Sequence, residues 1–334
     1  MVVSIRDVAA RAGVSVGTVS NVLNRPDAVS ATTVERVREA IAELGYVRND
    51  AARQLRAGRS RSIGLVVLDS ANPFFAEVSR GAEEEAAAHG LAVLVGNSDE
   101  RPEREAGYLE LFEQQRVSGV LISPIAERFD MLLRLRDNGI PVVLVDRAAP
   151  GSGLSSVAVD DVRGGYLAAR HLVETGRRRI VYVGGPQTLR QVADRLAGAR
   201  AAIAEAAGAQ LEIVTRPSLS VLEGRAAAQE ILARPARDRP DAVFAANDLL
   251  ATGALQAFVM DGSVRVPRDV ALIGYDDIDF ASSAIVPFSS VRQPSRLIGE
   301  TAMRILREET TGAATEPRDV LFEPELIVRA STAG

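Results

Sequence analysis

The chain has 334 residues, of which 47% are hydrophobic and 25% charged, and its formal net charge is −5. It has no cysteine and only two histidines, His89 and His171, which excludes disulfide bridges and thiolate metal sites and argues against structural zinc. No run of 18 apolar residues and no secretory signal pattern occurs, so we expect a cytoplasmic protein that does not bind membranes. The length predicts a small domain followed by a larger one, because a single core rarely grows this large.

Residues 4–24 read as two short helices joined by a tight turn. Ser4 and Asp7 have the spacing of a helix N-cap with an acidic third residue. Gly13 can adopt the positive φ of a short turn, and Ser15 can cap a second helix. This is the spacing of a helix-turn-helix, although ordinary helical hairpins share it. The residues that would face DNA in the major groove are Ser15, Val16, Gly17, Thr18, Ser20, Asn21 and Asn24.

A third helix is predicted after Ser30, with apolar residues at steps of three and four up to Leu44. Three short helices would form a compact headpiece over residues 1–48. Residues 1–60 contain nine arginines and six acidic residues, a balance of +3, whereas the whole chain is negative. The positive charge is therefore concentrated where DNA contact is predicted.

The segment from Asn49 to Gly58 reads NDAARQLRAG, and it resembles the hinge of the LacI/GalR family of bacterial regulators. The resemblance implies a hinge over residues 49–60 that becomes helical on the operator and inserts Leu55 into the minor groove, with Ala52, Arg53 and Arg56 beside it. The physical argument agrees, because so short a helix does not persist alone in water. A basic flexible linker is the alternative.

After residue 61 the sequence alternates apolar strand-like runs with helical stretches, which predicts parallel βαβ units. The family resemblance covers essentially the whole chain. It implies that residues 61–334 form a core of two doubly wound parallel-sheet lobes like those of periplasmic sugar-binding proteins. Lobe 1 would comprise residues 61–157 and 289–318, and lobe 2 residues 158–288 and 319–334. The chain would then cross between the lobes near Val157, Ser289 and Asp319.

In such sheets ligands bind at the carboxyl ends of the strands, in the crevice between the lobes. Carboxylates and arginine there suit a polyol, because each can bond two neighbouring hydroxyls. The alternative is structural: Asn and Asp often cap helices or turns, and one phenylalanine of NPFF can serve as a hydrophobic staple. The candidate ligand-binding residues, several of which match family positions, are Asn72, Phe74, Phe75, Asp146, Arg147, Arg195, Asn247 and Asp276.

The resemblance implies a DNA-binding transcriptional regulator, which we predict to be a homodimeric repressor on a pseudo-palindromic operator, switched by a small molecule. A sugar is the favoured effector, and a purine or nucleoside acting as corepressor is the alternative. A cytoplasmic solute-binding protein is a further alternative, which the headpiece disfavours. We find no Walker, G-x-S-x-G or dinucleotide-binding motif. We therefore expect no enzyme, no catalytic residue, no metal and no cofactor.

Overall fold

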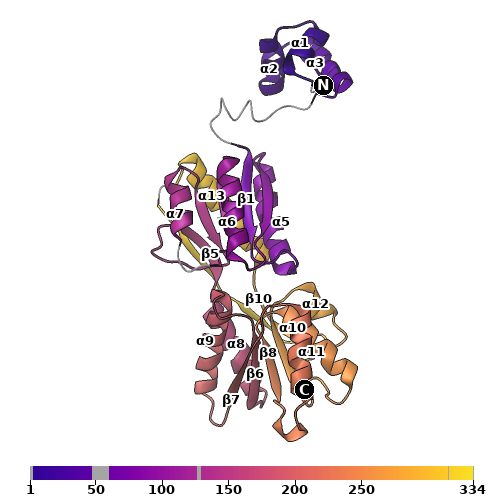
Figure 1. Ribbon diagram of the computed structural model, residues 1–334, viewed down its shortest axis with the longest axis vertical. Coiled ribbons are helices and arrows are strands. Elements are labelled where there is room, and N and C mark those ends of the chain that lie inside the picture. The colour runs from indigo at the N-terminus through magenta and orange to yellow at the C-terminus, as the bar shows by residue number, and fades with distance from the viewer. Residues whose placement is uncertain (1–2, 47–59, 126–128, 315, 334) are drawn as a thin grey trace. The chain divides into compact units, whose positions relative to one another are not determined.

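A computed structural model describes residues 3–46, 60–125, 129–314 and 316–333 of the chain. The chain divides into two compact units, Met1–Ser60 and Arg61–Gly334, each with its own hydrophobic core (Figure 1). The predicted fold class is confirmed, since the first unit is all-α and the second contains two α/β lobes.

The first unit consists of three helices around a small core. They are α1 (Ile5–Ala12), α2 (Val16–Asn24) and α3 (Ala31–Leu44), with a 3-10 turn η1 (Pro26–Ala28) between the last two. Asp7 accepts a hydrogen bond from the backbone N–H of Ser4 at 2.8 Å, which fixes the start of α1. Gly13 ends this helix at φ 63°, a conformation that favours glycine. Val8, Val19 and Val37 are completely buried where the three helices meet.

The first lobe of the second unit is built on a six-stranded parallel sheet with the order β11-β5-β4-β3-β1-β2. Its strands are β1 (Ser62–Val67), β2 (Ala92–Asn97), β3 (Gly119–Ile122), β4 (Val142–Val145), β5 (Ser155–Val159) and β11 (Asp319–Phe322). Its helices are α5 (Pro73–Ala88), α6 (Pro102–Gln114), α7 (Asp130–Asp137) and α13 (Ser295–Thr311). Alternate residues of β1 face opposite layers: Leu65 packs in the core with α5 and α13, and Val66 packs with Phe112 of α6.

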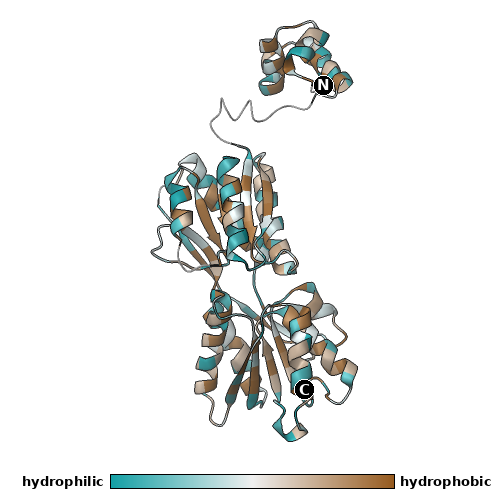
Figure 2. Ribbon diagram, viewed as in Figure 1, coloured by the Kyte–Doolittle hydropathy of each residue, from teal (hydrophilic) through white to brown (hydrophobic). Residues whose placement is uncertain are grey.

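The second lobe has a six-stranded sheet with the order β12-β10-β9-β8-β6-β7, in which the β10–β12 pair is antiparallel and the other pairs are parallel. Its strands are β6 (Arg179–Gly184), β7 (Gln210–Thr215), β8 (Ala242–Ala245), β9 (Ala271–Asp276), β10 (Ser289–Arg292) and β12 (Glu325–Ile327). Its helices are α8 (Asp161–Glu174), α9 (Arg190–Ala204), α10 (Val221–Leu232), η2 (Ala236–Asp238), α11 (Asp248–Asp261) and α12 (Asp279–Ser283). Figure 2 shows that apolar residues dominate the strands of both lobes, as expected for sheets covered on two faces.

Helix pairs in both lobes approach each other closely at glycines. A Cβ atom on Gly165 of α8 would lie 2.0 Å from the backbone oxygen of Arg195 in α9. A Cβ atom on Gly81 of α5 would likewise lie 2.0 Å from the backbone oxygen of Arg296 in α13. A side chain at either position would force the helices apart, so these glycines set the distance between them.

The chain crosses between the lobes three times, slightly later than expected. β5 belongs to the first sheet, β10 to the second and β11 to the first, so the crossings follow Val159, Arg292 and Phe322. The expected positions, near Val157, Ser289 and Asp319, fall two or three residues too early. Each strand completes its pairing before the chain leaves the sheet, and an apolar run does not reveal the sheet that it joins. None of the helices in the described ranges is long and apolar enough to cross a membrane.

Candidate functional site

A narrow cavity lies between the two lobes, at the carboxyl ends of several strands. The first lobe contributes Leu68, Asp69, Asn72, Phe74, Phe75, Glu100 and Asp146. The second lobe contributes Leu189, Gln191, Val192, Arg195, Leu219, Asn247 and Asp276.

Arg195 of α9 organises the second lobe's side of the cavity. Its Nε donates to Asp161 Oδ1 at 2.7 Å, and its Nη1 donates to the backbone oxygen of Ala246 at 2.8 Å. Nη1 also lies 3.7 Å from Asp276 Oδ1, and the guanidinium carbon is 3.7 Å from the centre of the Tyr275 ring. The side chain is only 5% exposed, so these contacts hold it in one position before any ligand arrives.

Three buried carboxyls surround this arginine. Burial raises the pKa of Asp276 to about 6 and raises the pKa of Asp146 and Asp161 above the usual range, while the Arg195 charge opposes each shift. Burial alone would lower the pKa of Arg195, but Asp161 and Asp276 outweigh it and hold that pKa well above its ordinary value. Arg195 is therefore charged, and the cavity carries more acidic than basic groups.

Two amide–carboxylate contacts cross the cavity from one lobe to the other. Asn72 Nδ2 in the first lobe donates to Asp276 Oδ2 in the second at 3.3 Å. Gln191 Nε2 in the second lobe donates to the Oδ2 and the backbone oxygen of Asp146 in the first, both at 2.8 Å. Asp146 is 4% exposed, and its Oδ1 has no hydrogen-bond partner within the part of the chain that the structure describes.

The cavity also has an apolar wall. Phe74 and Phe75, at the start of α5, are 3% and 5% exposed, and their rings meet edge to face with centroids 5.0 Å apart. Asn72 precedes them as the N-cap of α5, and its Oδ1 accepts from the Phe74 N–H at 3.0 Å. The polar and apolar sides together can hold a ring that has an apolar face and hydroxyls at its edge.

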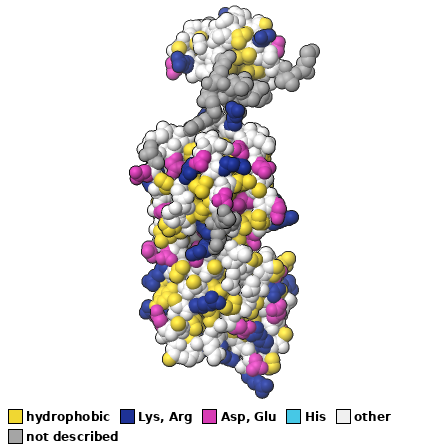
Figure 3. All heavy atoms as spheres, turned by 60° about the vertical axis from the view of Figure 1, so that its left-hand side comes forward, with side chains coloured by type: hydrophobic (Ala, Val, Ile, Leu, Met, Phe, Trp, Pro, Cys, Tyr) yellow, Lys and Arg dark blue, Asp and Glu magenta, His cyan; other side chains and the backbone are white. Residues whose placement is uncertain are grey.

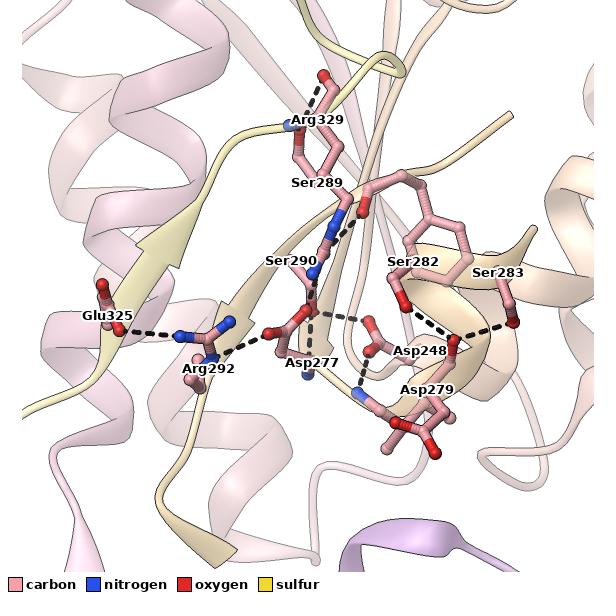
Figure 4. A network of polar contacts seen from close by, with 12 residues as sticks. Asp248, Asp277, Asp279, Ser282, Ser283, Ser289, Ser290, Arg292, Glu325 and Arg329 are labelled. Atoms are coloured by element: carbon pink, nitrogen blue, oxygen red, sulfur yellow. Dashed lines mark hydrogen bonds and ion pairs between the residues drawn. The ribbon is translucent and has the colours of Figure 1, made fainter. Parts of the chain in front are cut away.

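A network of polar contacts surrounds Asp277, the residue that follows Asp276 in the chain (Figure 4). The side chain of Asp277 is 3% exposed, and it pairs with Arg292 Nε at 2.8 Å and with Arg329 Nη1 at 2.6 Å. Arg292, the last residue of β10, also reaches Glu325, the first residue of β12, at 3.2 Å. This network therefore joins the loop after β9 to the strands that flank two of the three lobe crossings.

The same network continues to the residue that follows Asn247. Ser290 Oγ donates to Asp248 Oδ1 at 2.7 Å and accepts from the Asp277 N–H at 3.0 Å. Asp276 and Asp277 both have positive φ, 106° and 55°, which non-glycine residues seldom adopt. The surrounding hydrogen bonds hold Asp276 in this unusual conformation, with its carboxylate facing the cavity.

Seven of the eight predicted ligand-binding residues line the cavity, and Arg147 does not. The Arg147 guanidinium lies instead over the Phe129 ring, 5.8 Å from its centre. Asn247 both lines the cavity and caps α11, its Oδ1 accepting from Leu250 N–H at 2.9 Å. Binding of a ligand by these residues stays a prediction.

Sequence reasoning missed Gln191, Asp69 and Glu100, which also line the cavity. Gln191 lies four residues before Arg195 on α9, so helical spacing could have identified it. Asp69 and Glu100 belong to irregular loops, and no periodic pattern points to them. Asp161, the ion-pair partner of Arg195, was missed as well, because the two residues are 34 positions apart.

The first unit presents the predicted DNA-facing surface on α2. Val19 and Val22 are buried against the unit's core, whereas Val16, Gly17 and Asn21 are exposed. Ser15 accepts from the Thr18 N–H at 3.0 Å and caps the helix. Asn24 Nδ2 donates to the backbone oxygen of Ser20 at 2.8 Å, which ties its amide to the helix itself. The hinge candidates Ala52, Arg53, Leu55 and Arg56 lie outside the described residues.

On the face of the second unit that is drawn in Figure 3, arginine and acidic side chains are interspersed and not gathered by sign. Large apolar side chains are exposed on several elements of this unit: Leu94, Val95, Leu222, Met260 and Ile285.

A three-helix unit with helix-turn-helix spacing, followed by a two-lobed core with a cavity at its strand ends, defines the class of ligand-responsive DNA-binding regulators. Comparison with known families agrees. The family described as bacterial regulatory proteins, lacI family, matches residues 4–49. The family described as periplasmic binding proteins and sugar binding domain of LacI family matches residues 60–329. The chain belongs to the LacI family and is a DNA-binding transcriptional regulator.

Three relatives illustrate the similarity. The HTH-type transcriptional repressor PurR of Photobacterium profundum is 34% identical, with 98% of both chains covered. A solved complex of the transcriptional regulator CelR with cellobiose is 35% identical, covering 98% of this chain and 99% of that one, with a TM-score of 0.72. The lac repressor dimer bound to operator and the anti-inducer ONPF is 28% identical over all of both chains, with a TM-score of 0.84.

Proposed function

We propose that this protein is a repressor that binds a pseudo-palindromic operator as a homodimer and changes its operator affinity when a sugar occupies the interlobe cavity. The observation that carries the proposal is the pair of contacts across the cavity, Asn72 with Asp276 and Gln191 with Asp146. A ligand that replaces these contacts with its own hydroxyls changes the free energy of one lobe arrangement relative to another. Operator and ligand are then linked by one reciprocal coupling energy.

The DNA-binding role is assigned to the exposed side of α2 and to the hinge. Asn21 suits adenine, whose N6 and N7 an amide can bond together, and Val16 suits a thymine methyl group. Ser15, Thr18 and Ser20 have hydroxyls that suit phosphates or base edges. The hinge residues Arg53, Leu55 and Arg56, with Ala52, complete the proposed contact in the minor groove.

The test begins by selecting operator sequences from a random DNA library with the purified protein. We expect Asn21→Ala to lose about 1–3 kcal/mol of discrimination at one base position per half-site, as for a bidentate base contact. Glu39→Ala, at an exposed position of α3, is the matched control and should change little. A uniform loss on all sequences would mean that Asn21 only positions the DNA backbone.

The sugar assignment follows from the hydrogen-bonding groups of the cavity. Asp69, Glu100, Asp146 and Asp276 offer acceptors, and a sugar supplies many hydroxyl donors. The CelR relative binds cellobiose in its solved complex, which supports the same ligand class here. Calorimetric titration with neutral sugars should show binding, and the operator titration repeated with the bound sugar should show the sign of the switch.

A purine corepressor is the second candidate, favoured by the PurR relative and by the Phe74–Phe75 wall, against which a flat base could pack. Purines present fewer hydrogen-bond donors to these carboxylates than a sugar does, which favours the sugar at the cavity's polar side. Binding of hypoxanthine or guanine with no binding of any sugar would select this candidate.

The dimer proposal draws on exposed apolar side chains of the second unit. Leu222 in α10 and Met260 in α11 are 75% and 70% exposed, and a partner subunit can bury such side chains. The lac repressor relative is a dimer on its operator. Sedimentation should therefore give twice the chain mass. We further propose that the protein acts in the cytoplasm, where its DNA lies, and has no catalytic activity.

A further inference from the structure

Helix α5 runs from the cavity to the edge of the first sheet at which the chain enters the second unit. Its N-cap, Asn72, and the first-turn residues Phe74 and Phe75 line the cavity. Its other end leads into β2, whose Ala92 N–H donates to the backbone oxygen of Arg61 at 2.9 Å. Sixteen residues, each rising about 1.5 Å, give α5 a length of about 24 Å. One stiff element thus connects the cavity with Arg61, the first residue of the second unit.

The side chain of Arg61 binds the far end of this helix. Its Nε donates to the backbone oxygen of Gly90 at 2.7 Å, and its Nη2 donates to the same oxygen. Gly90 follows α5 at φ 66°, a conformation that favours glycine, and an added Cβ atom would collide with the Arg61 guanidinium. A cation is also favoured at the C-terminal end of a helix dipole. Arg61 is therefore joined to the end of α5 by its side chain and to β2 by its main chain.

Helix α13 holds α5 along its length. The two backbones approach so closely that a Cβ atom on Gly81 or on Gly299 would meet a backbone oxygen of the other helix. Near the C-terminal end of α5, Glu85 pairs with Arg307 of α13 at 3.5 Å. Rigid elements packed in this way carry free-energy coupling between distant sites. The two ends of α5 are therefore expected to move together.

The cavity end of α5 responds directly to what the cavity holds. Asn72 Nδ2 donates to Asp276 of the second lobe at 3.3 Å, while its Oδ1 caps the helix by accepting from the Phe74 N–H at 3.0 Å. A ligand that replaces the contact with Asp276 acts on the first turn of α5. A helix shift of about 1–2 Å, as in other switching proteins, then reaches Gly90 at the other end.

We propose that Arg61 is a positioning residue for operator binding: it fixes the point at which the hinge joins the second unit, and its bond to Gly90 makes that point follow α5. The inference rests on the proposed function, because the operator and the cavity ligand are those proposed above. Without this bond the point of attachment is less ordered, so more conformational entropy is lost when the protein binds the operator. The cavity and the operator are then coupled more weakly.

The test is a double-mutant cycle on operator affinity, measured by fluorescence anisotropy with the full-length protein and the operator selected from the random library. Arg61→Ala should weaken operator binding by about 3- to 30-fold, the range for residues that carry coupling. Asn72→Ser keeps a helix N-cap but removes the donor to Asp276. It should change the operator affinity of the wild type by at least about threefold and that of Arg61→Ala by less than about 1.5-fold, whereas uncoupled distant residues act additively. An equal change in both backgrounds overturns the inference, as does no change in the wild type.

Salt dependence separates positioning from a direct phosphate contact. If Arg61 neutralised a phosphate, Arg61→Ala would reduce the slope of log affinity against log salt concentration by about 0.9, whereas loss of a positioning residue leaves the slope unchanged. A reduced slope therefore contradicts the inference. Arg134→Ala removes an exposed arginine of α7 in the same lobe. It is the matched control for lost charge and should leave operator affinity unchanged.

A glycine pair tests the same bond without removing the charge. Gly90→Ala places a Cβ atom against the Arg61 guanidinium and should weaken operator binding as Arg61→Ala does. Gly176→Ala is its control, because Gly176 follows α8 at φ 89° and no heavy atom of a more distant described residue lies within 4 Å of its Cβ position. An equal loss in both glycine variants would assign the effect to backbone strain and refute the role of Arg61.

Circular dichroism in urea checks that each variant is folded. If the wild type selects no operator from the library, the proposed function itself fails. If it binds an operator and the cycle is additive, only the role of Arg61 fails.

Discussion

The two lobes contribute to the cavity in different ways. On the second lobe Arg195 and Asp161 are paired with each other, and Asp277 is bound by two arginines. On the first lobe Asp146 has an unused acceptor and Glu100 has no partner in the described ranges. Among the described residues that line the cavity, the polar side chains of the second lobe are engaged within the protein, whereas the first lobe presents these two unused acceptor groups. Mutations on the second lobe should therefore act mainly on stability, and those on the first lobe mainly on binding.

Arg195→Met should give the largest effect. It removes the positive charge that the described residues contribute to the cavity lining, and it leaves Asp161 and Asp276 buried without that charge. Removing one partner of a buried ion pair typically destabilises by about 3–5 kcal/mol. Urea denaturation of the full chain, followed by circular dichroism, measures the free energy of unfolding of the second unit.

Arg190→Ala is the control for this variant, because Arg190 is on the same helix and pairs with Asp194 at 2.8 Å on the surface. An exposed pair four residues apart contributes only about 0.3–0.5 kcal/mol. If both variants unfold at the same urea concentration as the wild type, the second lobe's network is not a source of stability and the contrast between the lobes fails.

Asp277→Asn should have a smaller but clear effect. It keeps the shape of the side chain but removes the charge that binds Arg292 and Arg329. A hydrogen bond to a charged group contributes about 1.5–3 kcal/mol, and the amide retains part of it, so we expect a loss of about 1–3 kcal/mol. Thermal unfolding measures this loss of stability, and Asp279→Asn, at an exposed position, is the control. A loss confined to ligand affinity, with stability unchanged, would place Asp277 among the ligand contacts.

Glu100→Gln should have the smallest effect on stability, visible as a change in its pH dependence. The pKa of Glu100 is raised from 4.5 to about 7 in the folded protein, so its contribution to stability is present below pH 4.5 and lost as pH rises through 7. The variant has no carboxyl group that ionises at this position. Its free energy of unfolding should therefore rise relative to that of the wild type between pH 4.5 and about pH 7. Solvent at the cavity mouth limits the gain to about 1 kcal/mol or less. A constant difference between the two proteins from about pH 4.5 to about pH 7.5 would contradict the assignment.

The sequence could predict those features that have a local signature. Apolar runs alternating with helical spacing identify parallel βαβ units, and the family resemblance supplies their division into two lobes. The resemblance also supplies Arg195, Asn247 and Asp276, whereas Asp146 follows from the rule that ligands bind at strand ends. The same rule also selected Arg147, because it cannot distinguish which way a strand-end side chain points. Contacts between distant residues leave no local signal, as the Arg195–Asp161 pair across 34 positions illustrates. Glu100 was missed for a related reason, since its loop has no periodicity.

The two last strands, β11 and β12, have a consequence for the order in which the protein can be made. β11 completes the first sheet and β12 the second, although most of the first sheet is encoded before residue 160. On the ribosome, neither sheet has all of its strands until residues 319–327 have emerged. The lobe whose synthesis begins first must wait for β11 at its edge, so the two lobes reach their final strand complements almost together.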